Sequence, residues 1–380
     1  MHKIRKRKLF IRYILLSGLL IATVTVLVIL FSIPEPPDRY VRSARENLTS
    51  ARDAHADRYA PKLYKQAGSL YDSAMIIWQS ENKKALIFRD YTRVIMLADS
   101  ASALAVRAAG QAGHNARNVS KQTGLAFSDL QERVRRISSV YGGLPLSDQF
   151  RDMLNQAKLL LEEARIARSK HEFHKAEDIL GRADKALTTA ENIAETRMKS
   201  YFEDYPAWEK LYNDALALSR KNNSVLIVVD KLAGELSIYR EGKRRSTFRT
   251  EFGPNWLGDK NHQGDQATPE GLYHVEKKKE RRQTRYYKAL LLNYPNPDDL
   301  QRYKSNVKKG VIPSGVDVGG LIEIHGHGGQ GFNWTNGCVA LTDKDMDVVY
   351  RQSSVHTPVI IVGSLVPYGE WIKAPGSVQD

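Results

Sequence analysis

The segment Leu321-Ile-Glu-Ile-His325 runs into Gly326-His-Gly-Gly-Gln-Gly331, and Thr335-Asn-Gly-Cys338 follows a few residues later. An alternating apolar run that ends in glycines is typical of a strand entering a turn-rich loop. His325 therefore closes a predicted strand, and Cys338 lies in a turn 13 residues further on. A loop of this length can fold the imidazole against the thiol, which needs a nearby base or cation to react as a thiolate.

Cys338 is the only cysteine in 380 residues, which excludes an internal disulfide framework and any site that needs two cysteine ligands. The small residues beside it let backbone N–H groups approach a developing oxyanion. Asn-Gly precedes it rather than an apolar run, which favours a nucleophile over an inert buried thiol. A zinc site built from His325, His327 and Cys338 is a weaker alternative, because no carboxylate motif accompanies the two histidines. His327 more simply lines the loop.

Short strand-like runs surround this segment and predict a mostly β domain over 223–366, followed by a tail at 367–380. The runs are Ser224–Asp230, Glu235–Tyr239, Thr247–Phe252, Gly271–Val275 and Pro358–Val362. Arg240-Glu-Gly-Lys243 lies between two of them and predicts a hairpin turn. Thr342 with Asp345 resembles a capping box, and it predicts a helix from Asp343 to about Ser353.

The region from about 224 to 364 resembles the L,D-transpeptidase (YkuD-type) catalytic domain of bacterial cell-wall enzymes. The resemblance rests on the opening strand, on Thr268-Pro-Glu-Gly271, on Ile324-His-Gly326 and on Thr335-x-Gly-Cys338, in the order of the family. The stretch from Leu292 to Gly320 looks like a subgroup with an enlarged insertion before the catalytic histidine. Together these pieces cover less than half of the chain.

The resemblance implies that Cys338 is the nucleophile and His325 the general base. It further implies an oxyanion hole from backbone N–H groups around Gly337 and Cys338, with support from Asn336, His327 and Gly326. In such enzymes the cysteine attacks the carbonyl before D-Ala of a peptidoglycan stem peptide. An amine or water then resolves the acyl-enzyme, and no metal or other cofactor is required.

Two residues depart from the usual family pattern. Asn336 stands where many members have a histidine, and Ala340 where many have an arginine suited to a substrate carboxylate. The basic run Lys277–Arg282 offers a substitute for that charge, although a solvated strand edge protected by charge explains it equally well. We expect substrate contacts from Thr335, Trp334, Arg282, Arg285 and Tyr287.

The region 34–222 has the apolar periodicity of helices, rich in alanine, with breaks at Pro61, at Tyr141–Pro145 and at Pro206. It predicts about four to six helices packed as antiparallel hairpins. A plain helical bundle is the simpler interpretation, and a module that sets reach or binds an envelope protein partner is the functional one.

The front of the chain predicts a membrane anchor. Residues 14–33 carry no charge, and a helix of that length is about 30 Å long, which matches one hydrocarbon core. Six basic residues lie in the flank 1–13, so this flank should stay in the cytoplasm and the rest of the chain should lie outside the cytoplasmic membrane. A cleaved signal peptide fits less well, because no small-x-small site follows the apolar run.

The formal net charge of +14 does not indicate nucleic-acid binding, because the exported part lies on the wrong side of the membrane. The sequence as a whole predicts a multidomain α+β protein: an N-terminal transmembrane helix, an α-helical bundle and a mostly β catalytic domain. The predicted substrates are peptidoglycan stem peptides. An L,D-carboxypeptidase or amidase that uses water, or a non-catalytic wall-binding scaffold, remain the alternatives.

Overall fold

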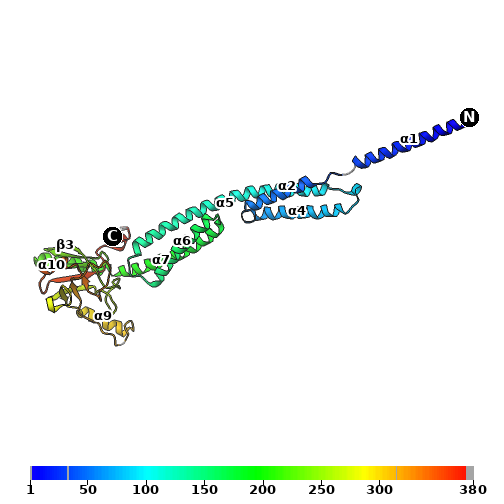
Figure 1. Ribbon diagram of the computed structural model, residues 1–380. Coiled ribbons are helices and arrows are strands. Elements are labelled where there is room, and N and C mark those ends of the chain that lie inside the picture. The colour runs from blue at the N-terminus through cyan, green and yellow to red at the C-terminus, as the bar shows by residue number, and fades with distance from the viewer. Residues whose placement is uncertain (1, 32–33, 314, 374–380) are drawn as a thin grey trace. The chain divides into compact units, whose positions relative to one another are not determined.

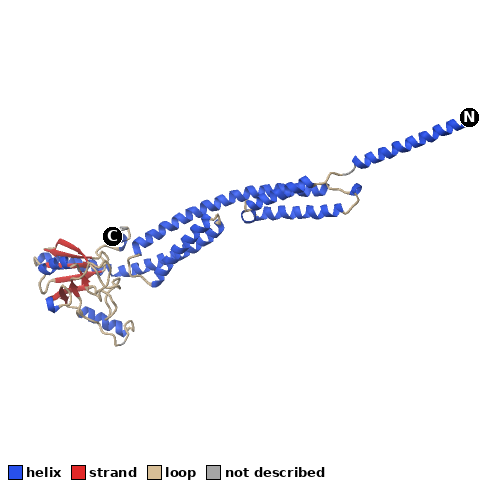
Figure 2. Ribbon diagram, in the orientation of Figure 1, coloured by secondary structure: helices blue, strands red, loops and turns tan. Residues whose placement is uncertain are grey.

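The computed structural model describes residues 2–31, 34–313 and 315–373, and the chain divides into two compact units. One unit comprises Met1–Ala126 with Ile166–Glu177, and the other comprises Phe127–Arg165 with Asp178–Asp380. Strands occur only in the C-terminal part of the described chain (Figure 2). The predicted α+β fold, with a mostly helical N-terminal region and a C-terminal β domain, is confirmed. The predicted domain limits stay a prediction.

The first unit is built from helices that pack through alanine. It contains all or part of α1 His2–Phe31, α2 Asp38–Asp53, α3 Ala56–Tyr59, α4 Pro61–Asn82, η1 Leu86–Phe88, α5 Thr92–Tyr141, α6 Asp148–Ser169 and α7 Phe173–Tyr201 (Figure 1). Its two buried clusters consist largely of fully buried alanines, such as Ala44 and Ala74 in one and Ala67 and Ala108 in the other. Small side chains allow helices to approach closely, which explains the alanine periodicity. The expected breaks are confirmed, because α4 begins at Pro61 and α5 ends at Tyr141.

The helix α1 is long and apolar enough to cross a membrane. Its most apolar window, Phe10–Leu27, has a mean hydropathy of 2.1, and no other helix in the described part of the chain meets the same criterion. The last two residues of the predicted anchor 14–33 lie outside the described residues. Whether α1 spans a membrane stays a prediction.

The second unit contains α8 Tyr205–Lys221, η2 Phe202–Asp204 and one curled sheet of strand order β3-β2-β1-β8-β4-β5-β6-β7. The strands are β1 Val225–Asp230, β2 Glu235–Arg240, β3 Lys243–Arg249, β4 Gly271–Glu280, β5 Lys288–Leu292, β6 Glu323–His325, β7 Val339–Ala340 and β8 Pro358–Val362. The remaining elements are η3 Arg281–Gln283, α9 Pro297–Lys308, α10 Asp343–Gln352 and α11 Tyr368–Trp371. β8 pairs parallel with β1 and antiparallel with β4, and thereby joins the two halves of the sheet.

Most predicted strands are confirmed, and the differences have physical causes. Glu241 and Gly242 both have positive φ, so the hairpin is tight and β3 starts at Lys243 rather than Thr247. β5 was not expected, because a five-residue apolar run beside tyrosines and basic residues has no clear period. Thr342 accepts a hydrogen bond from the Asp345 N–H, which confirms the predicted start of α10.

The helices of the second unit pack directly on its sheet. α8 contributes Ala215 to an apolar cluster with Leu226, Val228 and Ile360. Gly363, which follows β8, has no side chain because an added Cβ would lie 2.2 Å from the Trp208 ring. The helix α8 and the sheet therefore share one core.

Candidate active site

The sheet brings His325 and Cys338 to adjacent strands. β6 and β7 pair in parallel, with Ile324 opposite Val339 and His325 opposite Ala340. Cys338 directly precedes Val339, so the thiol and the imidazole lie on neighbouring strands of one sheet edge. Both residues are buried, with His325 at 0% and Cys338 at 8% exposure.

His325 is held in one tautomer. Its Nδ1 lies 2.6 Å from the carbonyl oxygen of Gly326, and because a carbonyl only accepts, Nδ1 carries the proton. The other ring nitrogen, Nε2, is buried and has no hydrogen-bond partner. Burial, helped by the nearby charge of Arg285, lowers the pKa of His325 to about 4, although the hydrogen bond to the Gly326 carbonyl acts in the opposite direction. The imidazole is therefore neutral at pH 7, with a free lone pair on Nε2.

The Cys338 thiol is protonated in this state. Burial raises its pKa to about 11, although a hydrogen bond from the Glu323 backbone and the charges of Arg285 and Lys260 act in the opposite direction. The S–H donates to the Leu321 carbonyl at 3.7 Å. The resting pair is thus a neutral thiol and a neutral imidazole, as in a serine hydrolase, rather than a thiolate–imidazolium pair.

The turn before Cys338 is fixed by Thr335. The Thr335 hydroxyl accepts from the Gly337 N–H at 3.2 Å and donates to the Cys338 carbonyl at 2.8 Å. Gly337 has a φ of 113°, and an added Cβ would lie 2.6 Å from the Ala267 carbonyl oxygen. Only glycine fits this position. The N–H of Gly337 already has a partner, so the N–H of Cys338 is the better candidate for contact with an oxyanion.

We expect Gly337→Ala to destabilise the second unit by about 1–3 kcal/mol more than Gly331→Ala does, because an overpacked carbonyl contact adds to the backbone strain. Gly331 lies in the same loop with a φ of 81°, but an added Cβ there meets no atom within 4 Å. Urea unfolding of both variants separates the contact from the strain. Equal unfolding midpoints would show that the Ala267 contact is unimportant.

Glu251 braces the loop between the two candidate catalytic residues. Its carboxylate accepts from the Gly331 N–H and from Trp334 Nε1, both at 2.7 Å. Its backbone N–H and C=O both pair with Ala340 of β7. Glu251 lies in the predicted strand Thr247–Phe252, but this role could not be predicted, because the contacts span about 80 residues and leave no local signal.

Aromatic rings cover the imidazole. Tyr286 stacks on His325 with ring centroids 3.5 Å apart and an interplanar angle of 5°, and Trp334 approaches the imidazole edge-on at 5.9 Å. Arg285 donates to the Tyr286 hydroxyl at 2.9 Å and lies over the same ring. This stack excludes water from one face of His325 and places a cation near the thiol. Tyr286 was not among the expected site residues, although its place in an aromatic and basic segment was a signal.

The other expected site residues have different surroundings. Arg282 and Asn336 are exposed, and the exposed Tyr287 donates to Asp347 at 3.3 Å. His327 is exposed with a φ of 67°, and its backbone N–H donates to Asp343 at 2.7 Å. Gly326 is buried, and an added Cβ would lie 2.5 Å from the Asp343 carboxylate. Arg282, Asn336 and Tyr287 are thus outward-facing, whereas Gly326 shapes the loop.

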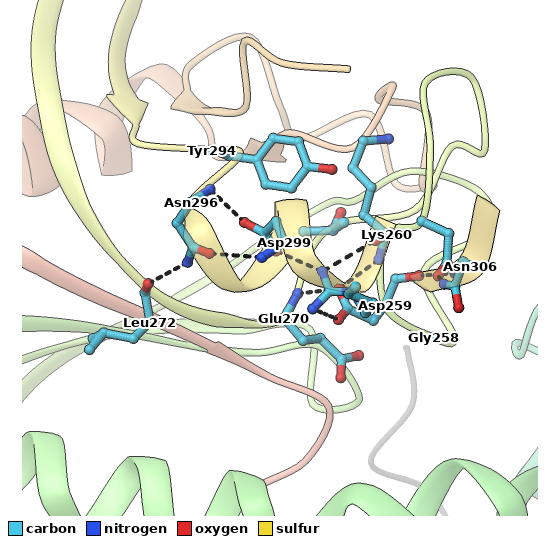
Figure 3. A network of polar contacts seen from close by, with 12 residues as sticks. Gly258, Asp259, Lys260, Glu270, Leu272, Tyr294, Asn296, Asp299 and Asn306 are labelled. Carbon is cyan, nitrogen blue, oxygen red and sulfur yellow. Dashed lines mark hydrogen bonds and ion pairs between the residues drawn. The ribbon is translucent and has the colours of Figure 1, made fainter. Parts of the chain in front are cut away.

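A buried polar network supports the loop that backs Cys338 (Figure 3). Asp259 accepts from the Glu270 N–H at 2.8 Å and pairs with Arg302 of α9 at 2.9 Å. Asn296 and Asp299 form a capping box at the start of α9, and Arg302 also binds Asp299. The network fixes Thr268-Pro-Glu-Gly271 against α9. The motif therefore has a structural role next to the site.

A cavity of about 280 Å³ adjoins the loop between His325 and Cys338, because Gly331 belongs to its lining. Its lining includes Arg249, Glu251, Trp256, Phe332 and Asn333. Glu251 thus braces the loop on one side and faces the cavity on the other. Among the residues that the structure describes, no group of three or more His, Cys, Asp or Glu side chains is placed to hold a metal ion.

Residues 224–361 match the YkuD family model, described as the L,D-transpeptidase catalytic domain, and the suspected resemblance is thereby confirmed. Bdellovibrio bacteriovorus Bd1075 is a similar solved structure, at 20% identity and a TM-score of 0.30, with 40% of this chain and 54% of that chain covered. An L,D-transpeptidase from Mycobacterium smegmatis is 16% identical at a TM-score of 0.25, with 37% and 58% covered. One from Mycobacterium tuberculosis H37Rv is 13% identical at 0.25, with 37% and 57% covered. The chain spans little more than half the length of these proteins. No curated protein sequence matches it.

Proposed function

We propose, from the premise that residues 224–361 form an L,D-transpeptidase catalytic domain, that this protein is a membrane-anchored cell-wall enzyme. It acts on peptidoglycan stem peptides through an acyl-enzyme on Cys338, with His325 as general base. The observation that carries the proposal is the buried, unpartnered Nε2 of a neutral His325 beside the strand of the thiol. An unsatisfied buried acceptor is costly, and a catalytic base is a reason to retain one.

The chemistry follows from the protonation states. Rotation about the Cβ–Sγ bond turns the S–H from the Leu321 carbonyl towards Nε2, which takes the proton as sulfur bonds to the substrate carbonyl carbon. The tetrahedral intermediate collapses when the C–N bond to D-Ala breaks and Nε2–H protonates the departing amine. A thioester remains on Cys338. The acceptor amine then attacks this carbonyl and gives its proton to Nε2. The C–S bond breaks, and Nε2–H passes the proton to the departing sulfur, which restores the thiol and the neutral imidazole.

The protein groups around the pair supply positioning. Proton transfer creates an imidazolium, whose Nδ1–H keeps its bond to the Gly326 carbonyl throughout. The Cys338 N–H faces the developing oxyanion. Arg285 provides a positive charge beside the thiol. This charge substitutes for the arginine that many family members carry at the position of Ala340. Trp334 and Thr335 act by shaping the site and not as direct substrate ligands. Trp334 packs edge-on against the His325 ring, and Thr335 holds the turn through its bond to the Cys338 carbonyl.

The location of the enzyme follows from its N-terminus. α1 would anchor the chain in the cytoplasmic membrane, with the basic flank inside and the catalytic domain on the envelope side. Peptidoglycan, the proposed substrate, lies on the envelope side of this membrane. The helical bundle would then set the distance at which the site works from the membrane, or bind an envelope protein.

The test is intact-mass measurement of the full chain in detergent, incubated with purified tetrapeptide muropeptides. We expect an adduct on Cys338 whose mass equals the muropeptide less D-Ala, together with free D-Ala. Cys338→Ala, which keeps the turn and removes the sulfur, should show neither. Dimeric products identify an amine acceptor, and tripeptide products alone identify water. A folded wild-type protein with no adduct and no D-Ala release would contradict the proposed enzyme.

A further inference from the structure

The connector between α4 and α5 exposes three large apolar side chains in succession. Leu86, Ile87 and Phe88 form the short helix η1 and are 52%, 50% and 71% exposed. Exposed apolar residues are ordinary when they occur singly, but a contiguous group is typical of an interaction surface.

This connector is held in shape by polar bonds. Arg89 donates to the carbonyls of Asn82 and Lys84, each at 3.0 Å. The Glu81 carboxylate accepts from Lys84 at 2.7 Å and from the Asp90 N–H at 3.0 Å. These bonds fix the two ends of the connector against each other. The apolar tips therefore point outward from a fixed turn and not from a loosely tethered loop.

The charges beside the apolar tips are mainly positive. Four basic residues lie between positions 81 and 93, namely Lys83, Lys84, Arg89 and Arg93, against the two acids Glu81 and Asp90. Both acids are engaged within the connector, since Glu81 binds Lys84 and Asp90 caps the Thr92 N–H at 2.9 Å. Lys83 and Arg93 are exposed. An apolar tip with a cationic rim matches the interface of a bilayer that contains anionic lipid.

The connector also lies at the end of the bundle that follows the apolar helix. Val41 of α2, Ala74 of α4, and Tyr91 and Val94 beside and within α5 share one buried cluster. The start of α2, the end of α4 and the start of α5 are thus side by side (Figure 1). α1 ends at Phe31 and α2 begins at Asp38, and the seven Cα–Cα steps between these two residues span about 25 Å at most. A membrane that holds α1 therefore lies within reach of the connector.

We propose that the connector between α4 and α5, residues 83–91, is a membrane-contact loop that inserts Leu86, Ile87 and Phe88 into the interface of an anionic phospholipid bilayer. The inference rests on the proposed anchoring by α1. The loop would supply a second attachment beside the anchor, with the basic rim on the lipid headgroups. Two attachments restrict the tilt of the first helical unit, which one flexible tether would leave free.

The test uses the full chain with Cys338→Ser, carrying a spin label on Ile87→Cys and reconstituted in vesicles of phosphatidylglycerol and phosphatidylcholine. We expect the label to lie about 5–10 Å inside the headgroup boundary, as measured by accessibility to oxygen against an aqueous nickel chelate. The matched control is Val106→Cys, a 55% exposed apolar position in α5 of the same unit, 14 residues beyond the start of that helix. Its label should remain in water.

Adding Leu86→Ser and Phe88→Ser should return the label at 87 to water. A label at 87 that is as accessible to the chelate as the label at 106 would overturn the membrane-contact loop, and would leave a protein as the occupant of this surface. Vesicle flotation after an alkaline carbonate wash reports on α1 separately. If the chain stays with the vesicles after the wash while the label at 87 is exposed to water, the anchor is supported and the membrane-contact loop is contradicted.

Discussion

Replacing His325 by glutamine is expected to slow acylation of Cys338 by about 10²- to 10⁴-fold, the usual contribution of a positioned general base. Glutamine is close in size and its amide can still donate to the Gly326 carbonyl, so the loop should keep its shape. It has no basic nitrogen to take the thiol proton. D-Ala release from tetrapeptide muropeptides in the first turnover measures the acylation step.

The matched control is His327→Gln, two residues along the chain. The His327 side chain is exposed and its ring lies 6.3 Å from Tyr286, edge-on. This variant should acylate within a few-fold of the wild-type rate. Equal losses in the two variants would mean that the loop as a whole, and not the Nε2 lone pair, carries the effect.

The pH dependence of acylation in the wild-type protein provides a second test of the role of His325. Burial lowers the pKa of His325 to about 4, so the neutral base persists as the pH falls through 6.5 and is lost only near pH 4. The acid limb of acylation should therefore lie near pH 4, and His325→Gln should lack it. Because burial raises the pKa of Cys338 to about 11, alkylation of the free enzyme should keep rising above pH 9.

The candidate catalytic pair could be predicted because its signals are local. A strand that ends in His-Gly and a turn that ends in Gly-Cys are each complete within a few residues, and they lie 13 apart. The glycine before the cysteine is likewise explained by its own backbone, with a φ of 113°. The resemblance to a family then suggested the roles that are proposed for these residues.

The residues that pack against His325 and hold the loop before Cys338 could not be predicted, because they belong to segments that are distant in the sequence. Tyr286 reaches His325 only because β5 pairs with β6, with Ala289 opposite His325. The sequence of β5 has no clear hydrophobic period, so the residues before it were interpreted as a basic loop or strand edge. Glu251 is a similar case, since an acid at a strand end usually faces solvent. The helix α9 was not predicted either: its residues lie in the stretch that was interpreted as an insertion, although Asn296 and Asp299 form a capping box at its start.

The buried ion pair Lys231–Glu270 could not be predicted from the sequence either, and removing its lysine is the second substitution for which we expect a large effect, here on stability. We expect Lys231→Met to destabilise the second unit by about 3–5 kcal/mol, the cost of leaving one partner of a buried ion pair alone. The Lys231 ammonium is fully buried and donates to Glu270 at 2.7 Å and to the carbonyls of Gly258 and Thr268 at 2.6 and 2.8 Å. Methionine matches the length of the chain and supplies none of these donors.

Glu270 explains why the loss should spread beyond one bond. Its carboxylate also accepts from the Tyr201 hydroxyl at 3.1 Å and from Trp208 Nε1 at 3.0 Å. The same residue thus joins α7 and α8 to the Thr-Pro-Glu-Gly motif beside the site. Without the lysine, a carboxylate that is 6% exposed must take up a proton or admit water, and either change loosens the helices against the sheet.

The matched control is Lys210→Met, which removes a lysine from an equally short pair with Asp214 at 2.6 Å. Those side chains are 79% and 60% exposed, so water screens the pair and its loss should leave the urea midpoint nearly unchanged. Urea unfolding followed by the fluorescence of the buried tryptophans compares the two variants. Lys231→Met combined with Glu270→Gln should recover part of the loss, because a neutral amide replaces the unpaired charge. If Lys231→Met unfolded at the same urea concentration as Lys210→Met, the polar network would not hold the helices to the catalytic domain, and the apolar contacts of α8 alone would have to do so.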